Sequence, residues 1–247
     1  MKQPSKKDYV WTTPTSADYF PLMKTTYLLI LIALVGMGSL GCGSSPKTEM
    51  VRQGYPGHWW QAIEGDAASW EISPDDAEEG EVILSKRNEL GILSNFAPTP
   101  FEFEGKKYAS LEGFWQSMKY PEDQEDPRSK YKGWPYTRAE VEQLVAFKAK
   151  RAGDFGSKAM KALGIDWVSY KGERMPYRTS EKGKHYQLIR RAMLAKLNQN
   201  TEVKEVLLKT TGLRLKPDHE QSDHAPPAWR YYKIWEEIRD DLLRRHQ

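Results

Sequence analysis

The stretch that decides the fold is Tyr108-Ala109-Ser110-Leu111-Glu112-Gly113-Phe114-Trp115-Gln116-Ser117-Met118-Lys119-Tyr120. Its apolar residues recur at i, i+3, i+4 and i+7, the spacing of an amphipathic helix. These residues are Leu111, Phe114, Trp115 and Met118. Ser110 is suited to cap the first turn, and Pro121 ends the pattern. The sequence therefore predicts a short helix with one buried face.

Three polar residues of the same stretch share the flank beside the apolar face. They are Glu112, Gln116 and Lys119, at spacings that bring helical side chains together. A carboxylate, an amide and an ammonium group would therefore meet at one place. The plainer interpretation of Glu112 is that an acidic residue in a first turn complements the helix dipole. The spacing by itself favours that interpretation over catalysis.

Upstream of the helix, the pattern is that of short strands. Residues 81–85, with Val82, Ile83 and Leu84 at their centre, are expected to form a short strand, and residues 101–103 and 106–108 alternate on either side of Glu104-Gly105. Two residues ending in glycine between alternating segments are typical of a β-hairpin. We expect a small antiparallel sheet here.

Downstream, the pattern is helical. Thr137 and Glu140 have the spacing of a capping box, and Gly153 would suit the end of that helix. Further apolar residues at helical spacing predict four more helices, over about 159–163, 180–198, 201–210 and from 228 onward. The predicted fold class is α+β, mostly α: a single helical domain over residues 81–245 with a small antiparallel sheet.

Several motifs together resemble one protein family. Leu93-Ser94-Asn95-Phe96, Glu104-Gly105-Lys106 and the quoted stretch 108–120 resemble, in order and spacing, the NADAR superfamily of YbiA-like proteins. The resemblance continues through residues 192–200 and 206–212. The family's glycine-rich stretch is absent, and residues 217–231 stand in its place. A family tryptophan also has no clear match near Ser180 and Glu181 in this chain.

The resemblance implies an enzyme that hydrolyses an N-glycosidic bond to ribose. The substrate would be an ADP-ribosyl, NAD-like or related ribosyl-nucleotide compound, and Glu112 would be the catalytic carboxylate. A carboxylate can stabilise an oxocarbenium-like ribose and activate water without a metal or cofactor. The residues expected to bind substrate are Ser94, Asn95, Phe96, Trp115, Gln116, Lys119, Asp218, Trp229 and Arg230. Phe96 and Trp115 fit core packing equally well.

Other functions stay open at this point. The two departures from the family favour a nucleotide-binding protein without turnover, and a structural lipoprotein that reuses the scaffold is a further alternative. Asp218, His219, Asp223 and His224 could be drawn as a metal cluster, but their spacing matches no ligand motif. We expect a polar loop there and no metal.

The N-terminal region has the order of an export signal. Residues 23–26 are a short, positively charged start with Lys24, residues 27–40 are apolar or small, and Gly41-Cys42 follows. This layout resembles bacterial lipoprotein signals, so we predict lipidation at Cys42 and a lipid-anchored protein of the cell envelope. Residues 1–22 read as a misassigned extension and residues 43–80 as a tether and loop. A short apolar helix in an intracellular protein is the alternative.

The charge balance argues against bulk nucleic-acid binding. The whole chain has a formal charge of +3, but four basic and two acidic residues precede Cys42, so 33 basic and 32 acidic residues remain from there on. The basic residues concentrate after residue 128. The basic C-terminal half of the chain would suit an anionic ligand such as a diphosphate. Alternatively, it would simply attract the more acidic half that precedes it.

Overall fold

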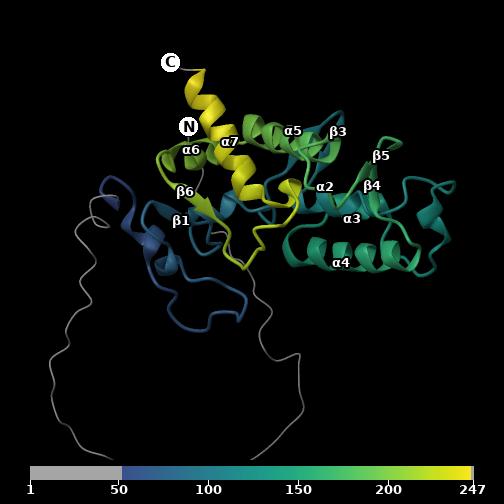
Figure 1. Cartoon of the computed structure of the whole chain (residues 1–247), viewed down its shortest axis with the longest axis horizontal. Helices are drawn as coiled ribbons and strands as arrows, with labels where there is room; N and C mark the ends of the chain where they lie inside the picture. The colour runs from purple at the N-terminus through teal and green to yellow at the C-terminus, as the bar shows by residue number, and fades with distance from the viewer. Residues whose placement is uncertain (1–51, 246–247) are drawn as a thin grey trace, which may run out of the picture.

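The computed structural model describes residues 52–245 (Figure 1). The predicted export signal with Cys42, and the extension of residues 1–22, lie outside this range. Within it, no helix combines the length and the apolar character needed to cross a membrane.

The described residues form an α+β fold of helices with small sheets, as the sequence predicted. The α-helices are α2 (Leu111–Ser117), α3 (Arg138–Glu142), α4 (Ala146–Ala162), α5 (Lys184–Gln199), α6 (Thr201–Lys209) and α7 (Tyr231–Arg244). The strands are β1 (Glu81–Ile83), β2 (Phe101–Phe103), β3 (Lys106–Tyr108), β4 (Trp167–Tyr170), β5 (Glu173–Pro176) and β6 (Arg214–Lys216). Five short 3-10 helices complete the described elements: η2 (Gly57–Trp60), η3 (Pro74–Asp76), η4 (Glu89–Leu93), η5 (Pro127–Lys130) and η6 (Pro227–Trp229).

Helix α2 and the hairpin before it follow the local rules of the sequence. The Ser110 hydroxyl accepts a hydrogen bond from the backbone N–H of Gly113 at 2.9 Å and so caps α2. In the turn between β2 and β3, Glu104 and Gly105 both have positive φ angles, 50° and 84°. Two such residues make the type I′ turn that matches the twist of paired strands. The predicted helix and hairpin are both confirmed.

The predicted small antiparallel sheet is present as the β2–β3 hairpin, but the structure contains further sheets and one of them is parallel. The structure has three two-stranded sheets: β2–β3 and β4–β5 are antiparallel, and β1 pairs in parallel with β6. Strand β6 has only one buried position, Leu215, so its sequence carries almost no periodic signal. Its partner lies more than a hundred residues away, and tertiary packing alone brings the two together.

The single helix predicted from Thr137 to Gly153 is two helices. The capping box of Thr137 and Glu140 does begin α3, but the chain breaks after Glu142 and α4 starts at Ala146. Helix α4 then runs through Gly153 and absorbs the separate helix predicted at 159–163. Gly153 is a packing residue, because a Cβ built there would lie 1.9 Å from Gln116 Oε1 on α2.

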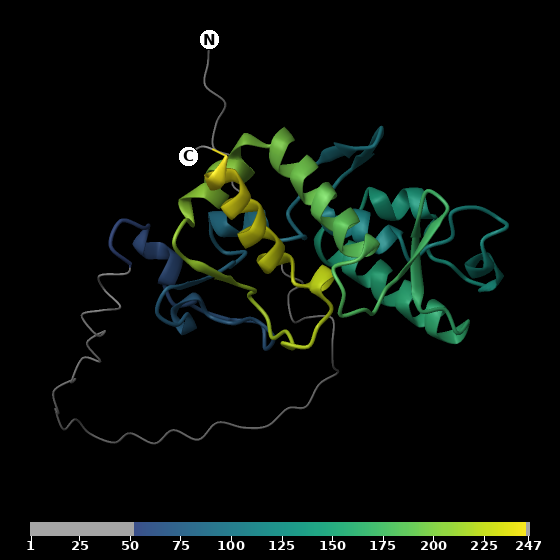
Figure 2. The ribbon, with the colours of Figure 1, turned by 45° about the horizontal axis from the view of Figure 1, so that its top comes forward.

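Helices α3, α4 and α5 all pack against α2, which therefore lies in the middle of the domain (Figure 2). The described residues before β1, expected as tether and loop, pack at the end of the molecule away from α3. Trp59 and Trp60 of η2 are buried there, and the Trp60 indole N–H donates to the Glu81 carbonyl at 2.9 Å. The packed domain thus begins upstream of residue 81.

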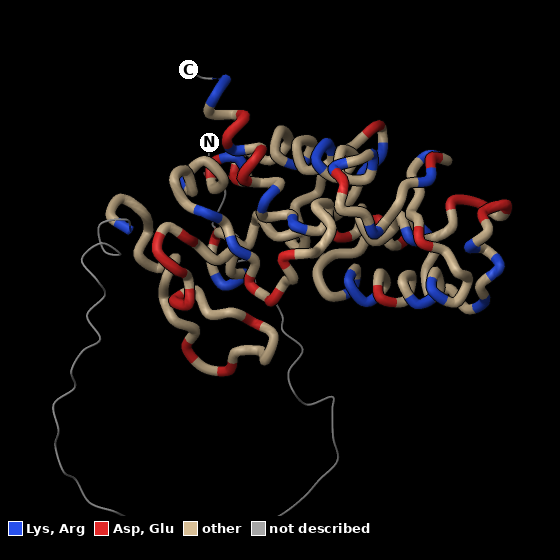
Figure 3. The backbone as a smooth tube through the Cα atoms, in the orientation of Figure 1, with Lys and Arg blue, Asp and Glu red and all other residues tan. Residues whose placement is uncertain are grey.

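Opposite charges of the two halves meet at several points in the fold. Acidic residues gather along the segment before β1, and basic residues along α4 (Figure 3). Glu81 pairs with Arg214 at 3.2 Å, and Glu104 pairs with both Lys171 and Arg191. Part of the charge asymmetry therefore serves folding.

Candidate functional site

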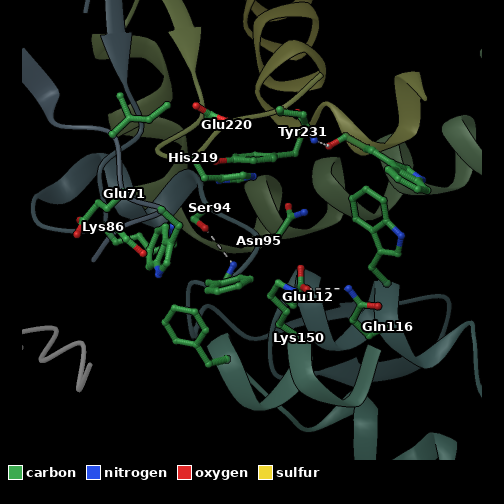
Figure 4. A pocket seen from close by; sticks show the side chains of 18 of the residues that line it. Glu71, Lys86, Ser94, Asn95, Glu112, Gln116, Lys150, His219, Glu220 and Tyr231 are labelled. Carbon is green, nitrogen blue, oxygen red and sulfur yellow. Dashed lines mark hydrogen bonds between the residues drawn. The ribbon is translucent and has the colours of Figure 1, made fainter. Parts of the chain in front are cut away.

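A cavity of about 780 Å³ lies beside α2 (Figure 4). That volume is within the usual range for small-molecule sites. Its walls come from the segment of residues 69–72, the turn after η4, α2, the start of α4 and the loop that leads into α7. Segments from across the whole described chain therefore converge on it.

Seven of the residues predicted from the sequence line this cavity. They are Ser94, Asn95, Phe96, Glu112, Trp115, Gln116 and Trp229. Helix α2 supplies three of them on consecutive turns. Asn95 adjoins α2 directly, because its carbonyl accepts a hydrogen bond from the Glu112 backbone N–H at 2.9 Å. The turn and the helix thus form one rigid wall.

Glu112 is a buried carboxyl group at this wall, with 6% of its surface exposed. The Gln116 amide donates a hydrogen bond to Glu112 Oε1 at 2.7 Å (Figure 4). Among the described residues, no other side chain donates a hydrogen bond to this carboxylate. Burial raises the pKa of Glu112, although the Gln116 hydrogen bond and the Lys119 charge oppose the shift. A carboxylate with a raised pKa is a stronger base than an ordinary glutamate.

Lys119 lies behind the cavity wall and does not line the cavity. Its ammonium donates to the Gly153 carbonyl at 3.2 Å and to Ser157 Oγ at 2.9 Å, so it ties α2 to α4. Burial lowers the pKa of Lys119 to about 8. The Lys119 charge lowers the pKa of Glu112, but its side chain does not line the cavity, where the family resemblance would place a substrate-binding residue.

Asp218 and Arg230 also lie outside the cavity lining. The Asp218 side chain is fully buried and pairs with Lys86 and, at 3.1 Å, with His219. These partners keep the pKa of Asp218 below its usual value despite the burial. Lys86 and His219 line the cavity in its place. Asp218 thus anchors the wall from behind.

Other lining residues were missed by the sequence analysis. They include Trp70, Glu71, Lys86, Phe147, Lys150, Tyr177, His219 and Gln221. Most lie in segments expected as loop or as ordinary helix, and nothing in their local pattern distinguishes them. Tyr231, at the end of the segment that stands in place of the family's glycine-rich stretch, also lines the cavity, and its side chain is buried. Its hydroxyl has no hydrogen-bond partner within residues 52–245.

A metal site is not found in the described part of the chain, where no three His, Cys, Asp or Glu side chains gather closely enough to hold an ion. Asp218 and His219 contact each other in the loop once considered for such a cluster.

Comparisons with known proteins give one similarity in structure. No protein-family model matches the chain, and no curated protein matches it. The NMR structure of the E. coli protein YbiA is similar over 69% of this chain and 89% of that chain. The two are 19% identical in sequence, with a TM-score of 0.45.

Proposed function

We propose that this protein hydrolyses an N-glycosidic bond to ribose in an ADP-ribosyl, NAD-like or related ribosyl-nucleotide substrate, with Glu112 as the catalytic carboxylate. The observation that carries the proposal is a buried Glu112 in the same cavity as Asn95 and Trp229. The motif resemblance to the NADAR superfamily supports it independently. Cavities that combine convergent polar groups with a carboxyl of perturbed pKa are the usual places for catalysis.

The proposed reaction needs one carboxylate and one water molecule. The bond between the ribose C1′ and the base nitrogen breaks, and its electron pair leaves with the base. Glu112 stabilises the positive charge that develops on the ribose. Water then attacks C1′ and gives its proton to Glu112, which passes a proton on to the departing base.

The neighbours of Glu112 have supporting roles in this scheme. Gln116 fixes the carboxylate by holding Oε1, so that Oε2 is available to water. The Asn95 side chain lines the cavity next to Glu112 and is suited to hydrogen-bond the sugar. Trp229 lies 5.0 Å from Tyr177 between ring centroids, and this pair supplies an aromatic surface for the leaving base.

We also propose that the protein is a lipid-anchored component of the cell envelope, with Cys42 as the acylated residue. The basic, apolar and small segments before Cys42 support this location. Its substrate would then lie outside the cytoplasm. Metabolic labelling with a radioactive fatty acid tests the anchor: the wild-type chain takes up label, and Cys42→Ser does not. Equal labelling of both chains would contradict the assignment.

The hydrolase proposal is tested with purified full-length protein and three substrates: NAD, an ADP-ribosylated peptide and ADP-ribosylated guanosine. Chromatography measures release of the base or conjugate. We expect turnover of at least one substrate by the wild type and its loss in Glu112→Gln. No turnover with micromolar binding would indicate a nucleotide-binding lipoprotein instead. Neither turnover nor binding would indicate a structural one.

A further inference from the structure

The outer part of the cavity is built from three aromatic rings on three separate segments. Phe147, at the start of α4, lies edge-on to Trp70 at 5.8 Å and edge-on to Phe96 at 5.1 Å between ring centroids. The Lys86 ammonium lies 5.2 Å from the ring centroids of both Trp70 and Phe96. These four side chains form one cluster, which we call the aromatic mouth.

Trp70 is unusual within this cluster because 41% of its surface is exposed. Only one other large hydrophobic residue in the described range, Tyr136, is classed as exposed. Covering an exposed indole ring with a planar partner removes apolar surface from water and is therefore favourable. The exposure of Trp70 at the rim of a cavity therefore indicates a ligand contact.

The backbone around Trp70 is firmly held. The Arg87 guanidinium donates two hydrogen bonds to the Glu71 carboxylate, at 2.8 and 2.7 Å. The backbone N–H of Ile72 donates to the Asp218 carbonyl at 2.9 Å. We call residues 69–72 the strap. Hydrogen bonds at Glu71 and Ile72 thus hold the part of the strap that comes directly after Trp70. A ring that is positioned before binding loses little conformational entropy when a ligand stacks on it.

Lys86 of the aromatic mouth, and Glu71 beside Trp70 in the sequence, lie on the far side of the cavity from the proposed catalytic carboxylate. Figure 4 shows Glu71 and Lys86 on the side away from Glu112 and Gln116. Tyr231, only 5% exposed, lines the same cavity, and its unpartnered hydroxyl can donate to a polar group of a ligand. A ligand that fills the cavity would therefore have a planar ring at one end, polar groups in the middle and a ribose at Glu112.

We infer that Trp70 and Phe147 form a second base-binding subsite, which holds the adenine of an ADP-ribosyl substrate while its far ribose reaches Glu112. This inference deepens the proposed function and rests on it for the position of the scissile bond. The substrate class is then a two-ended dinucleotide-like compound rather than a simple nucleoside. Base stacking on an aromatic side chain tolerates any base, so the subsite supplies affinity rather than strict base selection.

Calorimetric titration of the full-length protein with ADP-ribose, AMP and ribose 5-phosphate tests the subsite. We expect Trp70→Ala to weaken binding of ADP-ribose and AMP about tenfold, the usual scale of one lost stacking contact. Binding of ribose 5-phosphate should change less than about twofold, because it has no base to stack. Trp70→Phe should retain most of the affinity. Tyr136→Ala removes an exposed ring elsewhere and should change none of the three.

Equal ADP-ribose affinity in the wild type and Trp70→Ala overturns the inference, and so does the absence of ADP-ribose binding by the wild type. A thermal melt checks that Trp70→Ala is folded, and Trp70→Phe provides a second reading if it is not. These readouts need no turnover. If the wild type turns over substrate and Trp70→Ala has the same KM, the subsite is ruled out but the hydrolase proposal stands. If ADP-ribose binding depends on Trp70 but no substrate is turned over, the hydrolase proposal is ruled out but the subsite stands.

Discussion

The two sides of the cavity differ in how the chain builds them. The wall of α2 and the turn before it uses residues 94–95 and 112–116, which are close in sequence and joined by the hydrogen bond from the Glu112 N–H to the Asn95 carbonyl. The opposite side joins the strap to residues 219–221, almost 150 positions later. The first carries the groups suited to chemistry, and the second carries the surfaces suited to binding. Local sequence thus positions the proposed catalytic group, whereas long-range packing builds the surfaces proposed to bind the ligand.

The largest effect is expected at the α2 wall. Glu112→Gln keeps the shape and the contact with Gln116 but removes the charge, so turnover should fall about a thousandfold, within the range for a general base. The matched control is Glu202→Gln, because Glu202 occupies the same second position of helix α6. If both variants lost activity alike, helix stability and not catalysis would explain Glu112. Initial rates at saturating substrate measure the difference.

On the opposite side of the cavity, the largest loss of stability is expected from replacing Lys86. Lys86→Met leaves the fully buried Asp218 without its ammonium partner, which should lower the free energy of unfolding by about 3 kcal/mol. The same change at Lys184, whose pair with Glu173 is exposed, should cost less than about 1 kcal/mol. Denaturant unfolding measures both. Because the double variant Lys86→Met/Asp218→Asn removes both charges, it should recover part of the lost free energy of unfolding. If the losses of the two single variants simply add up in the double variant, Lys86 and Asp218 are not coupled.

A smaller effect is expected where α4 meets α2. In Gly153→Ala the new methyl group would overlap Gln116 Oε1, so Gln116 must turn away from Glu112. We expect turnover to fall about tenfold, the size of one lost charge-assisted hydrogen bond. Gly183→Ala is the control, since a Cβ there meets nothing within 4 Å. Unchanged turnover in Gly153→Ala would show that Gln116 does not position the carboxylate.

The smallest effect is a shift in pH dependence. In the proposed reaction Glu112 acts as an ionised carboxylate, so activity should fall as the pH drops through its raised pKa, above the ordinary glutamate value. The Lys119 charge lowers that pKa, so Lys119→Met should move the acid limb of kcat/KM to higher pH. Lys158→Met, an exposed change on α4, should leave the limb in place; a downward shift in Lys119→Met would contradict the electrostatic role.

The parts of the molecule that the sequence predicted are those with a local cause. Ser110 caps α2 because its hydroxyl reaches Gly113 three residues later, and the turn at Glu104-Gly105 fixes the hairpin. The helical spacing also placed Glu112 and Gln116 on one flank of α2, although Lys119 of the same flank lies behind the cavity wall, and Asn95 was expected only from the family resemblance. Each of these features needs only a short stretch of sequence to be read correctly.

The errors have a long-range cause. Gly153 looks like a helix end but is small because Gln116 of α2 passes over it. Asp218 looked like a binding residue, yet its carboxylate is held internally by Lys86. Trp70 lies in a segment read as a loop, and only the fold brings it beside Phe147. No local pattern carries such contacts, so the binding side of the cavity could not be predicted.

The most direct test of this division is a measurement of kcat and KM for Glu112→Gln and Trp70→Ala beside the wild type, on the ADP-ribosyl substrate that the wild type cleaves fastest. If Glu112 is the catalytic carboxylate, Glu112→Gln lowers kcat about a thousandfold with little change in KM. If Trp70 belongs to the second base-binding subsite, Trp70→Ala raises KM about tenfold with kcat nearly unchanged. The account is contradicted if Glu112→Gln alters only KM, or if Trp70→Ala lowers kcat as far as Glu112→Gln does.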